Sequence, residues 1–175
     1  MEPRPADLIV LGLDPGSRVT GWGIVAERGG SLALIDAGTI KLAAQADMAV
    51  RLGRIYEELA GLIAEHRPLE AAIENVFVNK NTLSALKLGQ ARGAAIAACA
   101  VAGLPVAGYE PTLVKKSIVG TGRAEKEQVA FMVGRLLGTT RRFALDASDA
   151  LAVAVCHLNE RRLRRLAKAT GAKCS

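Results

Sequence analysis

The chain opens with short apolar runs separated by turns. Residues Leu8 to Leu13 carry no polar side chain and predict a buried strand, which ends at a single carboxylate, Asp14. A Pro-Gly dipeptide follows at once and predicts a turn. Apolar residues at 21–25 predict a second strand that pairs back on the first, and residues 32–42 predict a third. Asp14 is therefore expected at the centre of a sheet, on rigid backbone.

The apolar spacing then changes to that of helices. Apolar residues recur at intervals of three and four between Met48 and Ile63, which predicts an amphipathic helix that ends before Pro68. A short strand over 71–73 delivers Glu74. The pattern goes on to predict helices over 83–101, 113–119 and 125–137, a strand over 104–109, and a last helix that starts near Asp146 and runs past His157. This order predicts a single α/β domain, a mixed five-stranded sheet flanked by helices.

The helix predicted over 83–101 has one face with almost no side-chain bulk. Small residues occupy every fourth position on this face, namely Ala85, Gly89, Gly93 and Ala97. Such a face lets another backbone approach closely. The neighbour is either the sheet of the same chain or a second subunit, and the pattern fits both.

Length and charge narrow the class of protein. The 175 residues suffice for one domain that buries about two thirds of its unfolded surface. Lys and Arg number 23 against 17 Asp and Glu, a net charge of +6. A basic domain favours a polyanionic partner, nucleic acid first and an anionic membrane surface second, while the alternative is that the charge only aids solubility.

The cysteines and the termini indicate the cellular compartment of the protein and the division of the chain into a domain with two flanking segments. Three cysteines, Cys99, Cys156 and Cys174, form no Cys-x-x-Cys pair, which favours free thiols in a reducing compartment and argues against structural zinc. No apolar signal core and no uninterrupted membrane span is evident, so we expect a cytoplasmic protein without a membrane partner. The expected layout is a flexible arm over residues 1–6, a folded domain over 7–160 and a basic tail over 161–175.

Two acids open the last predicted helix. Asp146 and Asp149 are three positions apart, which places both on one helical face, within reach of a single ion or of adjacent ions. The alternative is that an Asp in the first turn caps the helix and complements its dipole. One acid suffices for that purpose, however, and two like charges on one face repel unless a cation lies between them.

Glu74 repeats the pattern of Asp14, an apolar strand that ends in an acid. Two neighbouring strand-end carboxylates raise each other's pKa or hold a divalent cation. Oxygen ligands alone select Mg²⁺ or Mn²⁺ over zinc. If Asp146 and Asp149 join them, the cluster can hold two ions about 4 Å apart, which act on both sides of an in-line phosphoryl displacement. An acidic pocket in a basic protein is typical of a nuclease.

Five segments carry a resemblance to a known family, and they occur in order from about residue 8 to 157. They are I-V-L-G-L-D-P-G-S-R-V-T-G-W-G, A-I-E-N-V-F-V-N-K-N, S-A-L-K-L-G-Q-A-R-G, V-K-K-S-I-V-G-T-G-R-A-E-K-E-Q-V and D-A-S-D-A-L-A-V-A. The sequence resembles the RuvC family, bacterial crossover-junction endonucleases with a ribonuclease-H-like fold.

The resemblance implies a function and assigns roles to residues. It implies a homodimer that nicks two opposing strands of a four-way Holliday junction, leaves 5′-phosphate and 3′-hydroxyl ends, and works with the RuvA and RuvB branch-migration proteins. The implied catalytic tetrad, which holds two Mg²⁺ ions (or Mn²⁺ in their place), is Asp14, Glu74, Asp146 and Asp149.

The resemblance also implies DNA contacts. Lys115 and Lys126 match functional lysines of the family, and Phe77 matches an aromatic placed against DNA near the crossover, the alternative being a core residue. Further candidate backbone contacts, each of which is otherwise a solvated charge, are Lys80, Lys87, Arg92, Lys116 and Arg123.

Three alternative functions fit parts of the sequence. The sugar-kinase, actin and heat-shock ATPase superfamily also carries an Asp-x-Gly turn on its first strand, but it needs a second domain for which 175 residues leave no room. A junction-binding protein that has lost cleavage would keep the basic surface and not need the four acids. A general ribonuclease H would cut an RNA–DNA hybrid. His157, on an apolar helix, is expected to be structural.

Overall fold

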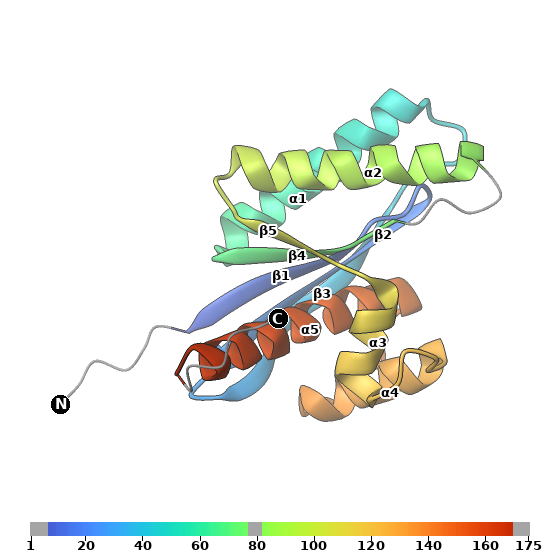
Figure 1. The fold of residues 1–175 in the computed structure, drawn as a ribbon. Coiled ribbons are helices and arrows are strands. Elements are labelled where there is room, and N and C mark those ends of the chain that lie inside the picture. The colour runs from blue at the N-terminus through green and yellow to red at the C-terminus, as the bar shows by residue number, and fades with distance from the viewer. Residues whose placement is uncertain (1–6, 77–81, 170–175) are drawn as a thin grey trace.

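The computed structural model describes residues 7–76 and 82–169 and shows a five-stranded sheet between two layers of helices (Figure 1). The elements in chain order are β1 (Leu8–Asp14), β2 (Val19–Arg28), β3 (Ser31–Lys41), α1 (Met48–His66), β4 (Glu70–Glu74), α2 (Thr82–Val101), β5 (Val106–Tyr109), α3 (Pro111–Val119), α4 (Lys126–Leu136) and α5 (Leu145–Ala169). Every strand and helix predicted from the apolar pattern is present.

The sheet has the strand order β3-β2-β1-β4-β5. β1, β2 and β3 form an antiparallel meander, whereas β4 runs parallel to β1 and β5 runs parallel to β4. The predicted single α/β domain with a mixed sheet is therefore confirmed. Because β1 and β4 are parallel neighbours, both strands end at the same edge of the sheet.

Each face of the sheet packs against its own set of helices. On one face, Leu11 and Leu13 of β1 pack in a core with α1 and α2. On the other face, Val10 packs in a second core that α3, α4 and α5 cover (Figure 1). Side chains alternate between the faces of a strand, so Asp14, four positions after Val10, belongs to the face covered by α5.

The helix α5 lies directly on the sheet because the strands beneath it carry glycine. It is buried without interruption from Ala147 to Leu158. A Cβ atom added to Gly12 of β1 would overlap the carbonyl of Ala150, and one added to Gly21 of β2 would overlap the carbonyl of Asp146. Bare backbone thus allows the first turns of α5 to approach the end of β1.

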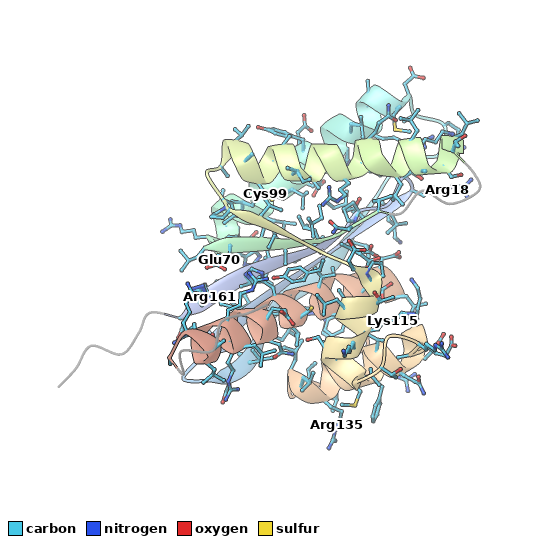
Figure 2. The ribbon with its side chains drawn as sticks, viewed as in Figure 1. Arg18, Glu70, Cys99, Lys115, Arg135 and Arg161 are labelled. Carbon is cyan, nitrogen blue, oxygen red and sulfur yellow. The ribbon has the colours of Figure 1, made fainter. Side chains whose placement is uncertain are left out.

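A polar cluster around the buried ring of His157 ties α5 to β4 and β5. The ring of His157 lies between the hydroxyl of Tyr109, 2.8 Å from Nδ1, and the carboxylate of Glu70, 2.6 Å from Nε2. Arg161 pairs with the other oxygen of Glu70 at 2.9 Å, and the two side chains lie next to each other in Figure 2. The structural role expected of His157 is confirmed. Residues 161–169, the first part of the predicted basic tail, continue α5.

The small-residue face of α2 points away from the sheet. A Cβ atom at Gly89 or Gly93 would meet no atom within 4 Å outside the local helix. The buried residues of α2 are Ala91, Ala95, Ala98 and Cys99. The sequence allowed this face to pack either on the sheet of the same chain or on a second subunit. Packing on the sheet of the same chain is therefore wrong.

The cysteines within the described ranges are buried free thiols. Burial raises the pKa of Cys99 and of Cys156 to about 11, so neither is poised as a nucleophile. Cys174 and the expected arm over residues 1–6 lie outside the described residues. Across 7–76 and 82–169, no helix has both the length and the apolar character that crossing a membrane demands.

Candidate active site

Asp14 and Glu74 stand side by side at the ends of two parallel strands. Leu13 of β1 pairs with Ile73 of β4, so the next residue of each strand is an acid. Ala72 of β4 packs in the core beneath α5, and the alternation of side chains places Glu74 on that same face. Two carboxylates predicted separately from strand-end patterns are thus neighbours on one face of the sheet.

The last helix brings the other two acids to this point. Asp149 of α5 lines a hollow together with Asp14 and Glu74. Asp146 lies one turn earlier, its backbone carbonyl against Gly21, and Gly21 pairs across the strands with Asp14. Three of the four acids thus line one hollow, and Asp146 lies near enough for its charge to contribute to the raised pKa of Asp14.

Two hollows of about 210 Å³ each share Asp14 and Glu74 in their walls. The second hollow is lined by both acidic and basic side chains, since Lys115 of α3 and Lys126 of α4 line it together with the acids (Figure 2 marks Lys115). This is the arrangement expected of a site that receives a phosphate group, where cationic groups contact its oxygens and carboxylates hold a metal ion.

Burial and the repulsion between neighbouring acids raise the pKa of two carboxylates in the site. Burial, followed by the charges of Glu74 and Asp149, raises the pKa of Asp14 to about 7, and Lys126 opposes the increase. The pKa of Glu74 is raised as well, by burial first and by Asp149 second. Buried carboxylates that repel one another bind protons or cations to relieve the repulsion. This donor set fits a hard divalent cation.

Lys126 is the cation nearest to the acids. It is the first residue of α4, and the turn before it is fixed by the backbone N–H of Glu125, which donates to Oε1 of Gln128 at 3.0 Å. Its Nζ donates to Oδ2 of Asp149 at 2.7 Å. This hydrogen bond is the main reason why the pKa of Lys126 is raised, so the lysine stays charged beside the site.

The site fits a metal ion after side-chain adjustment. All four acids offer oxygen ligands, which Mg²⁺ and Mn²⁺ prefer. Within the described part of the chain, no three Asp, Glu, His or Cys side chains already converge as ligands of one ion. Asp149 is turned toward Lys126. For Asp149 to bind an ion, its carboxylate would therefore have to turn away from Lys126.

The predicted DNA contacts fall into three groups. Lys87, Lys116 and Arg123 are exposed on α2, on α3 and before α4. Arg92 is half-buried and directed inward, with Nε donating to the carbonyl of Glu74 at 3.1 Å. Phe77 and Lys80 lie outside the described residues.

Two polar residues near the site were not singled out from the sequence. Asn75 lines the first hollow, and its Nδ2 donates to Oε1 of Glu110 at 2.9 Å. Oε2 of Glu110 is buried without a hydrogen-bond partner among the described residues. Glu110 follows β5 and precedes Pro111, which repeats the strand, acid, proline pattern of Asp14. That pattern is the signal by which Glu110 could have been found.

Carboxylates at two adjacent strand ends, with a helix laid across them that carries two more, are the arrangement of ribonuclease-H-like metal-dependent nucleases. The sequence matches the RuvC family, described as "Crossover junction endodeoxyribonuclease RuvC", over residues 10–157. It is 64% identical over 160 residues to the crossover junction endodeoxyribonuclease RuvC of Solidesulfovibrio magneticus, which covers 91% of this chain and 95% of the relative.

Solved structures agree with the sequence match. A structure of Thermus thermophilus RuvC superposes with a TM-score of 0.81 at 34% identity, over 90% of this chain and 97% of that one. A second structure, of T. thermophilus RuvC in complex with Holliday junction substrate, has a TM-score of 0.80 at 32% identity, over 89% and 96%. The chain belongs to the RuvC family of crossover junction endodeoxyribonucleases, metal-dependent enzymes of DNA recombination and repair. The ATPase and general ribonuclease H alternatives are therefore wrong.

Proposed function

We propose that this protein resolves four-way DNA junctions with Asp14, Glu74, Asp146 and Asp149 as its metal-binding catalytic residues. The observation that carries the proposal is the hollow in which Asp14, Glu74 and Asp149 meet, with the pKa of Asp14 raised to about 7. The substrate follows from the family and from the relative in complex with Holliday junction substrate.

The chain's own residues position the phosphodiester and balance its charge. The four acids would hold two Mg²⁺ ions, for which Mn²⁺ could substitute, and the metal would supply Lewis-acid activation of the phosphate and of the attacking water. Lys126 and Lys115, which line the same hollow, contact non-bridging phosphate oxygens. Water adds to phosphorus in line and releases one proton to solvent, the bond from phosphorus to the 3′ oxygen breaks, and that oxygen takes a proton from solvent. The products are 5′-phosphate and 3′-hydroxyl ends, which a ligase can seal.

The surface around the site holds the junction. Phe77 stacks on unpaired bases near the crossover, and the basic residues Lys80, Lys87, Lys116 and Arg123 contact the phosphate backbone. The exposure of Lys87, Lys116 and Arg123 supports this part of the proposal.

Symmetric nicking of two strands calls for two sites, and hence for a homodimer. We place the contact between subunits on the outer face of α2. The support is that Gly89 and Gly93 leave this face open to a second backbone, and that Leu83 and Leu86, 70% and 60% exposed, stand beside them. We further propose partnership with RuvA and RuvB and action in the cytoplasm, for which membership of the family is the support.

Incubation of a synthetic four-way junction with the protein, with and without Mg²⁺, tests the function. We expect paired nicks at symmetric positions, only with Mg²⁺, and none on a linear duplex or an RNA–DNA hybrid. Asp14→Asn should abolish the nicks and leave junction binding largely intact, because the carboxylate contributes to metal binding and not to the DNA-holding surface. Nicks by Asp14→Asn, or loss of binding while the fold is preserved, would contradict the assigned role. A cleavage-deficient binding protein would show binding without nicks.

A further inference from the structure

Arg92 reaches from α2 to the turn that follows β4. Its Nε donates to the carbonyl oxygen of Glu74 at 3.1 Å, and its Nη2 donates to Oδ1 of Asn75 at 2.8 Å. A guanidinium is planar and presents its donors in a fixed fork, so two acceptors on consecutive residues define the orientation of the turn. One of those residues is the catalytic acid that ends β4.

Asn75 is held from three sides. Besides accepting from Arg92, it donates through Nδ2 to Oε1 of Glu110 at 2.9 Å, and its backbone N–H donates to the carbonyl of Tyr109 at 2.8 Å. The three side chains of Arg92, Asn75 and Glu110, which we call the Glu74 clamp, thereby connect α2 to the ends of β4 and β5. The charges of Arg92 and Glu110 balance across the neutral amide.

The sheet leaves space for the clamp at Gly108 of β5. A Cβ atom at this position would collide with Oδ1 of Asn75 and would lie 3.3 Å from Nη2 of Arg92. The site of the amide is thus defined by the backbone of β5 as well as by its hydrogen bonds.

We propose that the Glu74 clamp positions the carboxylate of Glu74 toward Asp14, and that Arg92 is a positioning residue and not a phosphate contact. The inference rests on the proposed role of Glu74 in metal binding. Glu74 pairs with Tyr109 of β5, and the bond from the Asn75 N–H to the Tyr109 carbonyl extends this ladder by one residue. The fork of Arg92 adds a second constraint, because it binds the carbonyl oxygen of Glu74 itself. Groups that orient metal ligands in this way commonly contribute about 10- to 100-fold to metal affinity or activity.

The substitution Arg92→Lys separates the two roles of Arg92. Lysine keeps the positive charge that a phosphate contact needs, but it cannot span the Glu74 carbonyl and the Asn75 amide together. We expect junction binding in EDTA, and its salt dependence, to equal those of the parent. Single-turnover cleavage should fall about 10- to 100-fold, and the rise in melting temperature that Mg²⁺ induces should shrink. High Mg²⁺ should partly restore cleavage, which a simple folding defect would not allow.

Gly108→Ala provides a second test that changes no charge. It should displace Asn75 and reproduce the cleavage and Mg²⁺ defects, again with normal junction binding. The matched control is Arg54→Lys, an exposed arginine of α1 paired with Glu58 at 2.8 Å, which should behave like the parent.

Two outcomes would overturn the inference. In the first, Arg92→Lys and Gly108→Ala cleave like the parent at limiting Mg²⁺. In the second, Arg92→Lys weakens junction binding in EDTA while Gly108→Ala does not affect cleavage. Glu74→Gln in the same assay distinguishes this failure from failure of the proposed function. If Glu74→Gln still cleaves, the proposed metal-binding role of Glu74 is wrong. If Glu74→Gln is inactive but Arg92→Lys and Gly108→Ala cleave like the parent, only the proposed positioning role of the clamp is wrong.

Discussion

Asp14 combines the burial of a core residue with an ionisable carboxyl group. Its pKa is raised from 3.8 to about 7 by burial and by the neighbouring acids, so the neutral carboxyl is the form that the metal-free fold favours. The stability that neutral Asp14 provides is complete below about pH 4 and is lost as the pH rises through about 7.

The substitution Asp14→Asn should therefore stabilise the metal-free protein at neutral and higher pH. The asparagine amide is close in shape to the carboxyl group of aspartate and carries no charge at any pH. In EDTA at pH 8 we expect a higher melting temperature than the parent's, a gain of up to ~4 kcal/mol if the full shift of about three pKa units is realised. At pH 4 the gain should vanish. A melting difference that is the same at both pH values would show that ionisation of Asp14 is not its cause.

Among the secondary-structure elements, α5 decides whether the site forms. It is the one described helix that carries two of the acids, and it lies against β1 and β2 because glycine leaves the strands bare. Gly21 pairs with Asp14 across the strands and faces the carbonyl of Asp146, so it defines the spacing between these two acids.

Gly21→Ala should push the start of α5 away from the sheet. The added Cβ would overlap a backbone carbonyl, which cannot rotate away as a side chain does. We expect a loss of about 1–3 kcal/mol in the free energy of unfolding, measured with urea, together with a lower cleavage rate. The matched control is Gly61→Ala on α1, where a Cβ meets nothing within 4 Å and should stabilise the helix by up to about 1 kcal/mol. Equal effects of the two substitutions would contradict the close-approach argument.

The molecule as a whole is positively charged, but its candidate active site is lined by several acids. The net charge is +6, yet Asp14, Glu74 and Asp149 share one hollow at the edge of the sheet, while Lys115, Lys116 and Arg123 lie on α3 and in the segment before α4. If these cations bind the phosphate backbone as proposed, they bring it toward the edge of the sheet that holds the acids.

Removal of one cation beside the site should change how junction binding depends on salt. For Lys116→Ala we expect weaker binding in EDTA and a slope of log affinity against log salt concentration that is shallower by about one. Arg54→Ala, on the helical layer of the opposite face, is the control and should leave the slope unchanged. The assignment of Lys116 fails if both substitutions give the same slope.

Local pattern predicted the elements and the chemistry of this protein to a large extent. The helix Met48–His66 follows from apolar residues at intervals of three and four, and its end follows from Pro68. Asp14 and Glu74 were found because an acid directly after an apolar strand is costly unless a cation or proton accompanies it. These patterns involve only residues close together in the sequence, so they can be read without knowing which segments pack against each other.

Contacts between distant segments could not be obtained in this way. The apolar pattern does not say that β4 runs parallel beside β1, and this pairing alone makes Asp14 and Glu74 neighbours. Charge alone marked Arg92 as a DNA contact, whereas its hydrogen bonds to the turn after β4 direct it inward. The spacing of small residues on α2 identified a bare face but not its direction. Periodicity along a chain specifies which residues share a face, but only packing against other elements specifies what that face meets.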